Sequence, residues 1–347
     1  MDEFELIRRY FTRPTHKAAL GVGDDCALLQ PQAGMQLAVS SDMLVCGQHF
    51  FADVSPSTLG HKALAVNLSD LAACGARPLA FTLALSLPEA DEGWLEPFAR
   101  GMFALADAYG CELVGGDTTR GPLNICITVF GEVPPGRALL RSGAQVGDDI
   151  WVSGTIGDAR LALEALQGHA YLPPHLLQAA RLRLEQPSPR LALGLALRGL
   201  ATAAADVSDG LVGDLGHILG SSGVGAEIDL NAAIKLIAAN VEDTGAEDQL
   251  GFKISKTRIL NYILNGGDDY ELVFTAPPTQ RTAVRAAGVD TKTPVTRIGS
   301  IVAKAGLRLR DGKGKLSKYT SKSFNHFADS AKHTINHSYD SIFQEDM

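Results

Sequence analysis

The sequence predicts an α/β protein with two domains, and three observations support this. The chain has 347 residues, more than one hydrophobic core usually holds, so two domains of roughly 150 residues each are expected. Strand-like and helix-like patterns alternate along its first part. The turn-rich stretch Val133-Pro134-Pro135-Gly136 then separates this part from a second one, which opens with another strand-like run.

The expected first domain, residues 1–140, combines a helix with several strands. A β-rich run covers Gln36 to Ser41, and apolar residues recur at helical spacing from Ser57 to Ala73. Further strand-like runs follow, several of them ending at Gly or Asp, and they are Phe81 to Leu87, Cys111 to Val114 and Ile125 to Val129.

The expected second domain, residues 141–327, opens with the strand Ile150-Trp151-Val152-Ser153. It continues through helices rich in Ala and Leu to about Arg198. Residues 328–347 are polar without an apolar period, which is typical of a frayed tail.

Composition excludes some classes of function. Lys and Arg number 31 against 39 Asp and Glu, a net charge of −8, and no basic block interrupts this balance, so a nucleic-acid partner is not expected. The N-terminus lacks a signal-peptide pattern, and no apolar run reaches the ~18 residues of a membrane helix. The five cysteines never form C-x-x-C. We therefore expect a soluble cytoplasmic protein with reduced thiols and no membrane partner.

Six short motifs that carry Asp distinguish this sequence, each at the predicted end of a strand or turn. Singly, each is ordinary turn or helix-cap chemistry. Together they predict a cation site, because gathered carboxylates repel one another and hard oxygen ligands favour Mg²⁺. The motifs are Gly23-Asp24-Asp25, Ser40-Ser41-Asp42, Asn67-Leu68-Ser69-Asp70, Gly115-Gly116-Asp117-Thr118, Asp206-Val207-Ser208-Asp209-Gly210 and Gly266-Gly267-Asp268-Asp269-Tyr270.

Other well-known phosphate-binding and hydrolytic motifs are absent from the sequence. It contains no G-x-x-x-x-G-K-[ST], no G-x-G-x-x-G after a strand, no protein-kinase set, no H-E-x-x-H and no G-x-S-x-G. A carboxylate-and-metal ATP site remains, with glycine pairs that let backbone N–H groups approach phosphates. Phosphoryl transfer suits such a site, because it needs in-line positioning and neutralised charge.

In the same order, from about residue 4 to 327, these motifs closely resemble those of thiamine-monophosphate kinases. The resemblance implies ATP-dependent, Mg²⁺-assisted phosphorylation of thiamine monophosphate to thiamine diphosphate. It also implies an α/β (α+β) fold like that of aminoimidazole ribonucleotide synthetase, with several Mg²⁺ ions and ATP in a cleft. In that fold the N-terminal strands form a β-barrel across a homodimer.

The resemblance implies a role for each matching position, with no side chain as a covalent catalyst. The implied metal ligands are Asp25, Ser40, Ser41, Asp42, Asp70, Asp117, Asp206 and Asp209, and the implied ATP contacts are Tyr109, Gly116, Asp117, Arg141 and Ser208. Plainer alternatives stay open: Arg141 as a surface residue, Tyr109 as a core aromatic, and Ser208 as a helix cap.

For the phosphate acceptor, the resemblance implies contacts from His49, Asp268 and Phe324. Two departures from the family pattern affect this end. Asp268 stands where relatives often have Glu, and Ser323-Phe324-Asn325 stands where many have Gly, an aromatic residue and Asp. The alternatives are a loop histidine at position 49 and a phenylalanine that only anchors the C-terminal segment.

Two rival functions stay open. The first is another ATP-dependent enzyme of the same superfamily. Selenophosphate synthetase uses a reactive Cys or selenocysteine before its Gly-Asp motif, whereas no cysteine precedes Cys26 here, and the hydrogenase-maturation dehydratase ends in a functional Cys, whereas this sequence ends in Gln344-Glu345-Asp346-Met347. A non-catalytic cation-binding protein is the second rival, against which the complete carboxylate set argues.

Overall fold

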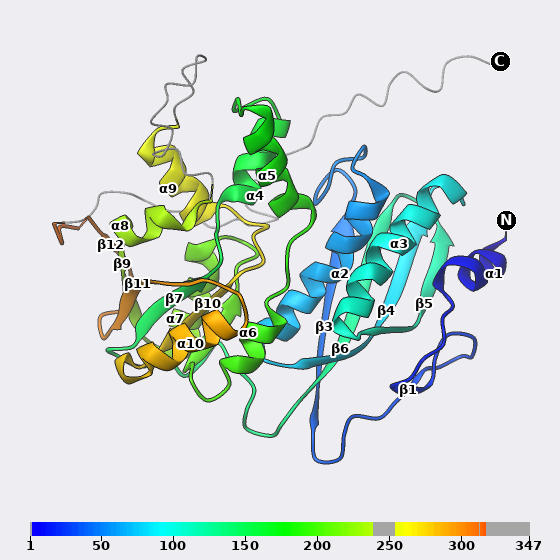
Figure 1. Cartoon of the computed structure of the whole chain (residues 1–347), viewed down its shortest axis with the longest axis horizontal. Helices are drawn as coiled ribbons and strands as arrows, with labels where there is room; N and C mark the ends of the chain where they lie inside the picture. Colours follow the sequence, from blue (N-terminus) through cyan, green and yellow to red (C-terminus); the bar gives the residue numbers. More distant parts are fainter. Residues whose placement is uncertain (1, 239–253, 312, 317–347) are drawn as a thin grey trace.

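The structure is a computed structural model that describes residues 2–238, 254–311 and 313–316. Two sheets dominate it, one of four strands in the order β3-β6-β4-β5 and one of six in the order β12-β9-β11-β7-β10-β8 (Figure 1). Phe324 and the predicted tail at 328–347 lie outside the described residues. In the described part, no helix combines the length and apolar character needed to cross a membrane.

The four-stranded sheet belongs to the first part of the chain. Its strands β3 and β4 each pair with β6 in antiparallel fashion, whereas β4 and β5 run parallel. This sheet is open, with β3 and β5 at its two edges, so one chain alone does not form the expected barrel. The N-terminal elements are α1 (Glu3–Leu6), a π-helical turn (Ile7–Phe11), β1 (Ala18–Leu20), β2 (Leu28–Leu29), β3 (Gln36–Val45), β4 (Arg77–Leu87), β5 (Glu112–Arg120) and β6 (Asn124–Val133).

Two long helices, α2 (Pro56–Ala73) and α3 (Glu92–Tyr109), cover one face of this sheet (Figure 1). Glycines let them approach closely. A Cβ added at Gly60 would lie 2.1 Å from the Phe98 carbonyl oxygen, and one added at Gly101 would lie 1.9 Å from that of Ser57. Because no larger residue fits at either position, the two glycines allow α2 and α3 to cross at close range.

The six-stranded sheet is mostly antiparallel, with β10 between β7 and β8. Helix α2 packs against α6 and β8, and one hydrophobic cluster extends from the four-stranded sheet to Trp151 and Phe274. The predicted division after residue 140 stays a prediction. The elements are β7 (Asp149–Ser153), α4 (Asp158–Leu166), α5 (Pro174–Glu185), α6 (Leu191–Ala196), β8 (Ala203–Asp206), α7 (Leu211–Ser222), β9 (Gly225–Asp229), α8 (Leu230–Ala233), α9 (Lys256–Asn265), β10 (Leu272–Ala276), α10 (Arg281–Asp290), β11 (Val295–Val302) and β12 (Gly306–Arg310), with short 3₁₀ turns at Ile234–Leu236 and Pro278–Gln280.

The predicted helix and strands are all present, but the strands are longer than predicted. The prediction that each Asp motif lies where a strand or turn ends is wrong for three of them. Asp42 lies within β3, Asp70 within α2 and Asp117 within β5. The two strands are edge strands, which accept polar residues within their length, so the apolar run is interrupted before the strand ends.

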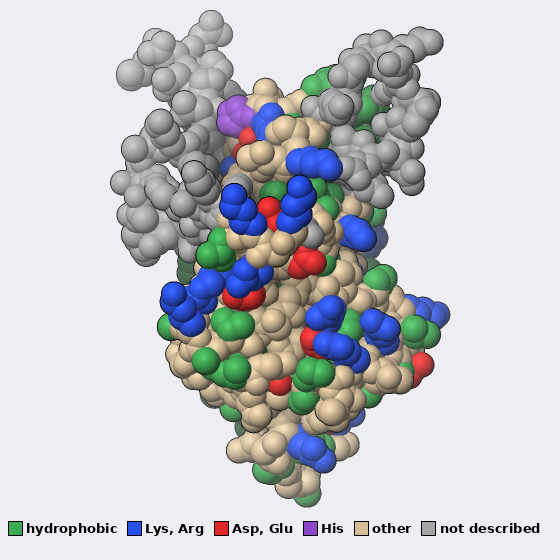
Figure 2. Space-filling model, turned by 90° about the vertical axis from the view of Figure 1, so that its left-hand side faces the viewer, with side chains coloured by type: hydrophobic (Ala, Val, Ile, Leu, Met, Phe, Trp, Pro, Cys, Tyr) green, Lys and Arg blue, Asp and Glu red, His purple; other side chains and the backbone are tan. Residues whose placement is uncertain are grey.

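The surface of the six-stranded part carries both signs of charge. On the face in Figure 2, lysine and arginine side chains are scattered, with aspartate and glutamate between them, and the apolar patches are small.

Candidate active site

A cavity of about 490 Å³ lies where the four-stranded and six-stranded parts meet. Its size is that of a small-molecule site. Most of the predicted site residues line it: Ser40, Asp42, His49, Asp70, Arg141, Asp206, Ser208, Asp209 and Asp268. The fold therefore gathers five of the predicted carboxylates, from four separate motifs, around one space.

Alternation along β3 aims its polar residues at the cavity. Ser40 and Asp42 line it, whereas Ser41 points to the opposite face, where its hydroxyl donates to the Ile127 carbonyl at 3.1 Å. This is the two-residue period of a strand. Of the predicted Ser40-Ser41 pair, only Ser40 therefore reaches this cavity.

The segment Asn67-Leu68-Ser69-Asp70 of α2 connects the other motifs. Asn67 Oδ1 accepts a hydrogen bond from the backbone N–H of Asp42 at 3.0 Å, and Ser69 Oγ donates to Asp206 Oδ2 at 2.8 Å. Asp70 Oδ2 accepts from Ser40 Oγ at 2.5 Å. One helical turn thus aligns β3 with the end of β8.

Three of the cavity carboxyls, Asp42, Asp70 and Asp206, resist ionisation. Burial raises the pKa of Asp42 to about 6, and the charges of Asp70 and Asp209 add to the effect. Burial also raises the pKa of Asp70, which the Ser40 hydrogen bond and the Arg141 charge partly offset. The pKa of Asp206 lies well above its usual value, again through burial first and then through the charge of Asp70. A bound cation would remove this penalty.

The loop after β8, which carries Ser208 and Asp209, is held by Asp214, a residue that the sequence motifs did not single out. Asp214, in the first turn of α7, accepts hydrogen bonds from the backbone N–H groups of Ser208 and Asp209, both at 3.1 Å. It is only 3% exposed, and burial raises its pKa to about 7. An Asp in the first turn of a helix was the available signal.

The loop before β10 forms the other wall. Asp268 and Tyr270 both adopt positive φ, at 66° and 51°, which is uncommon for residues other than glycine. Their backbone N–H groups donate to the carbonyls of Ser208 and Val207, each at 2.9 Å. His49, which also lines the cavity, is held through its ring, since its Nδ1 accepts from the Val45 backbone N–H at 3.0 Å.

Several predicted residues do not line the cavity. Asp25 lies on an exposed turn, and Asp117 is exposed on β5, at the sheet edge opposite β3. A glycine is required at position 116 for packing, since a Cβ there would lie 1.8 Å from the Leu83 carbonyl oxygen. Tyr109 donates its hydroxyl hydrogen to the Pro189 carbonyl at 3.2 Å.

Carboxylate oxygens are the ligands that Mg²⁺ prefers. In residues 2–238, 254–311 and 313–316, no three His, Cys, Asp or Glu side chains are grouped as ligands of one ion. The donor set nevertheless fits a hard cation, because Asp42, Asp70 and Asp206 line one cavity and repel one another.

Comparisons with known proteins give the family. The model of the AIR synthase related protein N-terminal domain matches residues 23–133, and that of the C-terminal domain matches residues 145–312. A thiamine-monophosphate kinase of Salmonella typhimurium is 45% identical over 335 residues, which are 94% of this chain and 98% of the relative.

Solved structures agree with this relation. The crystal structure of thiamine-monophosphate kinase from Stenotrophomonas maltophilia superposes with a TM-score of 0.78 and 45% identity, and covers 90% of this chain and 96% of that one. The structure of AaThiL complexed with AMPPCP and TMP gives a TM-score of 0.71 at 30% identity, over 86% of this chain and 89% of that one. The chain therefore belongs to the thiamine-monophosphate kinase family, among the AIR synthase related proteins.

Proposed function

We propose that this chain transfers the γ-phosphoryl group of ATP to the phosphate of thiamine monophosphate, which yields ADP and thiamine diphosphate. The observation that supports this most strongly is the 45% identity to thiamine-monophosphate kinase over 98% of the relative's length. The related complex with AMPPCP, an ATP analogue, and TMP is consistent with both substrates. A cavity of about 490 Å³ that is lined by five aspartates together with His49 and Arg141 suits a polyphosphate donor and a second ligand.

Mg²⁺ is the cofactor that we propose for this cavity. Asp42, Asp70, Asp206 and Asp209, with Ser40, would hold it, because their oxygens line one space, where burial and neighbouring carboxylates raise the pKa of Asp42 and Asp206. When bound, Mg²⁺ supplies positive charge against the phosphate oxygens in the transition state. We also propose Asp25, Ser41 and Asp117 as ligands, on the family resemblance alone.

The chain's own groups would position the reactants. Arg141 lies on the cavity wall, where its guanidinium can hold two phosphate oxygens of ATP. Ser208 lines the same wall near the start of α7, where its hydroxyl can donate to a phosphate. Gly116 and Tyr109 complete the proposed ATP contacts. Transfer breaks the bond from the γ-phosphorus to its bridging oxygen and forms a new bond to an acceptor oxygen.

At the acceptor end, His49 and Asp268 are the proposed contacts. His49 lines the cavity, and the hydrogen bond that its Nδ1 accepts from Val45 holds the imidazole ring in place, so the residue is positioned for contact with the acceptor. Asp268 brings a carboxylate that suits a cationic thiazolium. Phe324, the third proposed contact, lies outside the described residues.

We further propose a homodimer in which the four-stranded sheets of two copies close a β-barrel. The strand β3 supports this, because it is an open edge whose outer face exposes large apolar side chains: Leu37 is 45%, Val39 56% and Met43 53% exposed. Exposed apolar edges are normally paired or covered in folded proteins.

Light scattering at micromolar concentration should give twice the chain mass of 36.7 kDa. The double variant Val39→Glu with Met43→Glu should shift this mass toward the monomer, because it puts charge into the proposed seam. Val289→Glu is the matched control. Val289 is 77% exposed on α10, outside the four-stranded sheet, so this substitution should leave the mass unchanged. A monomeric unmodified protein would contradict the dimer.

The proposed activity is tested by a substrate panel. The protein is incubated with Mg²⁺ and ATP together with thiamine monophosphate, with aminoimidazole precursors, or with selenide, and the products are separated by chromatography. We expect thiamine diphosphate in the first mixture and ATP turnover in none of the others. Turnover that requires selenide or an aminoimidazole precursor would favour the rival enzymes of the superfamily.

A further inference from the structure

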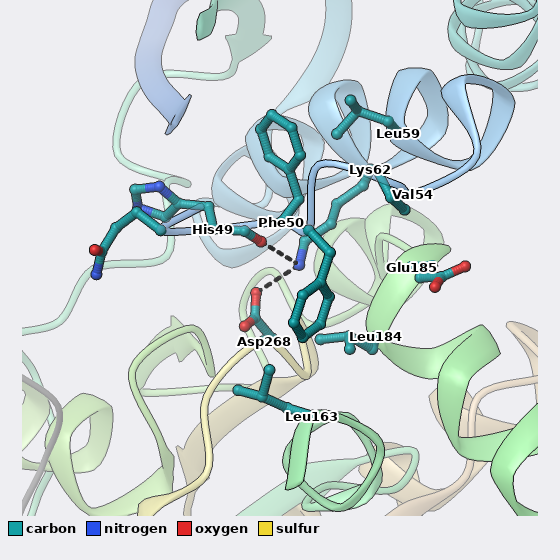
Figure 3. Close-up of a pocket in the computed structure, with 11 residues that line it drawn as sticks. His49, Phe50, Val54, Leu59, Lys62, Leu163, Leu184, Glu185 and Asp268 are labelled. Carbon is teal, nitrogen blue, oxygen red and sulfur yellow. Dashed lines mark hydrogen bonds and ion pairs between the residues drawn. The ribbon is translucent and has the colours of Figure 1, made fainter. Parts of the chain in front are cut away.

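A second, smaller pocket adjoins the acceptor end of the carboxylate cavity. It measures about 40 Å³ and is mainly apolar, with Phe50, Leu59, Leu163 and Leu184 among its lining residues (Figure 3). His49 and Asp268 line both this pocket and the cavity, so the two spaces are neighbours. A lysine that belongs to none of the Asp motifs, Lys62, lies at their border.

Lys62 is buried in the interior of α2, with 4% of its side chain exposed. Its Nζ donates to Asp268 Oδ1 at 2.8 Å and approaches the His49 carbonyl oxygen at 3.5 Å (Figure 3). Such an ion pair contributes little net stability, because Lys62 loses its hydration on burial while Asp268 keeps part of its own. The lysine instead connects the Asp268 carboxylate to the backbone of His49, and these two residues are the proposed acceptor contacts.

Asp268 is a residue that needs such a constraint. Its φ of 66° is strained for a side chain with a Cβ, and such a conformation persists only where the surroundings hold it. Its Oδ1 receives Lys62 Nζ and, at 3.4 Å, the Tyr270 hydroxyl. Oδ2 is therefore the oxygen that remains to meet a ligand. The side chain is 32% exposed, on the cavity side of the buried ammonium.

We propose that Lys62 is a positioning residue for the phosphate acceptor, which holds Asp268 by Oδ1 and directs Oδ2 at the cationic ring of that acceptor. This rests on the proposed function. The ion pair also joins α2 of the four-stranded part to the loop before β10, so it sets the spacing of the two walls where the acceptor enters. Lys62 acts through Asp268 and does not touch the ATP end of the cavity.

The test is a double-mutant cycle in steady-state kinetics. Lys62→Met should raise KM for thiamine monophosphate about tenfold, the scale of a lost hydrogen bond to a charged group, and should leave KM for ATP within about twofold. Asp268→Asn should raise the same constant. Lys62→Met added to Asp268→Asn should change it less than about twofold further, because the lysine acts through the carboxylate.

Lys235→Met, at an exposed lysine far along the chain, is the matched control and should leave both constants unchanged. Circular dichroism confirms that each variant is folded at the assay temperature. Equal increases of KM for ATP and thiamine monophosphate, or effects of Lys62→Met and Asp268→Asn that multiply, would overturn the positioning role while wild-type activity stands. Wild-type protein without thiamine diphosphate formation would instead refute the proposed function, and this inference with it.

Discussion

Asp42→Asn and Asp70→Asn, each nearly isosteric, should each lower turnover by about 100-fold or more, because each removes the charge of a proposed Mg²⁺ ligand. In EDTA, the melting temperature of either variant should stay unchanged or rise, since burial raises the pKa of both carboxyls in the folded state and the charges of Asp70 and Asp209 raise that of Asp42 further. Activity assays with Mg²⁺ and melting curves without it provide the two measurements.

The pH dependence sharpens this expectation for Asp42. A carboxyl whose pKa is raised from 3.8 to about 6 by folding destabilises the folded state once it ionises. The stability gained by Asp42→Asn should therefore be absent below pH 3.8, grow as the pH rises to about 6, and then level off. Asp290→Asn, at an exposed position on α10, is the control and should change neither property. Near-normal turnover in the Asp42 or Asp70 variant would remove that residue from the proposed metal site.

Glu271→Ala should lower the free energy of unfolding by about 3–5 kcal/mol, because it breaks a buried ion pair and strands two cations. Glu271 is fully buried, and its carboxylate accepts from Arg183 at 2.7 Å and from Arg190 at 2.5 and 2.7 Å. Ser153 Oγ donates to it at 2.6 Å. Chemical denaturation followed by circular dichroism measures the loss.

The chain offers a matched control for this substitution. Glu227 accepts from Arg310 through both oxygens at 2.6 Å, but the pair is exposed, with 26% and 38% of the two side chains accessible. Glu227→Ala should therefore cost less than about 1 kcal/mol. Equal losses for the two variants would mean that burial of the Glu271 network does not determine its strength.

Local patterns predicted the elements of the fold better than their ends. The helix expected at Ser57 to Ala73 is α2, which starts one residue earlier. It could be predicted because its apolar residues recur at helical spacing throughout. The strand expected at Gln36 to Ser41 continues to Val45. The polar run Ser40-Ser41-Asp42 interrupts its apolar residues, so a search for continuous β-rich runs ends there, although Met43, Leu44 and Val45 continue the strand.

Short motifs predicted the cavity well, but its supporting contacts could not be predicted in this way. Asp42, Asp70 and Asp206 are each recognisable from their own motif, and the fold brings them to one space. Lys62 is not recognisable, because its partner Asp268 is 206 residues away. Asp25 and Asp117 have recognisable motifs, yet neither lines the cavity of a single chain. Asp117 lies on β5, at the sheet edge opposite β3, and a short motif does not reveal the order of strands in a sheet.

The most direct test of the proposed reaction is phosphorus NMR of the protein with ATP, thiamine monophosphate and Mg²⁺. The spectra should show ADP and thiamine diphosphate appearing in equal amounts, without inorganic phosphate, and no reaction in EDTA or with Asp42→Asn. ATP hydrolysis to ADP and inorganic phosphate with thiamine monophosphate unchanged, or equal rates with and without Mg²⁺, would contradict direct transfer at the carboxylate cavity.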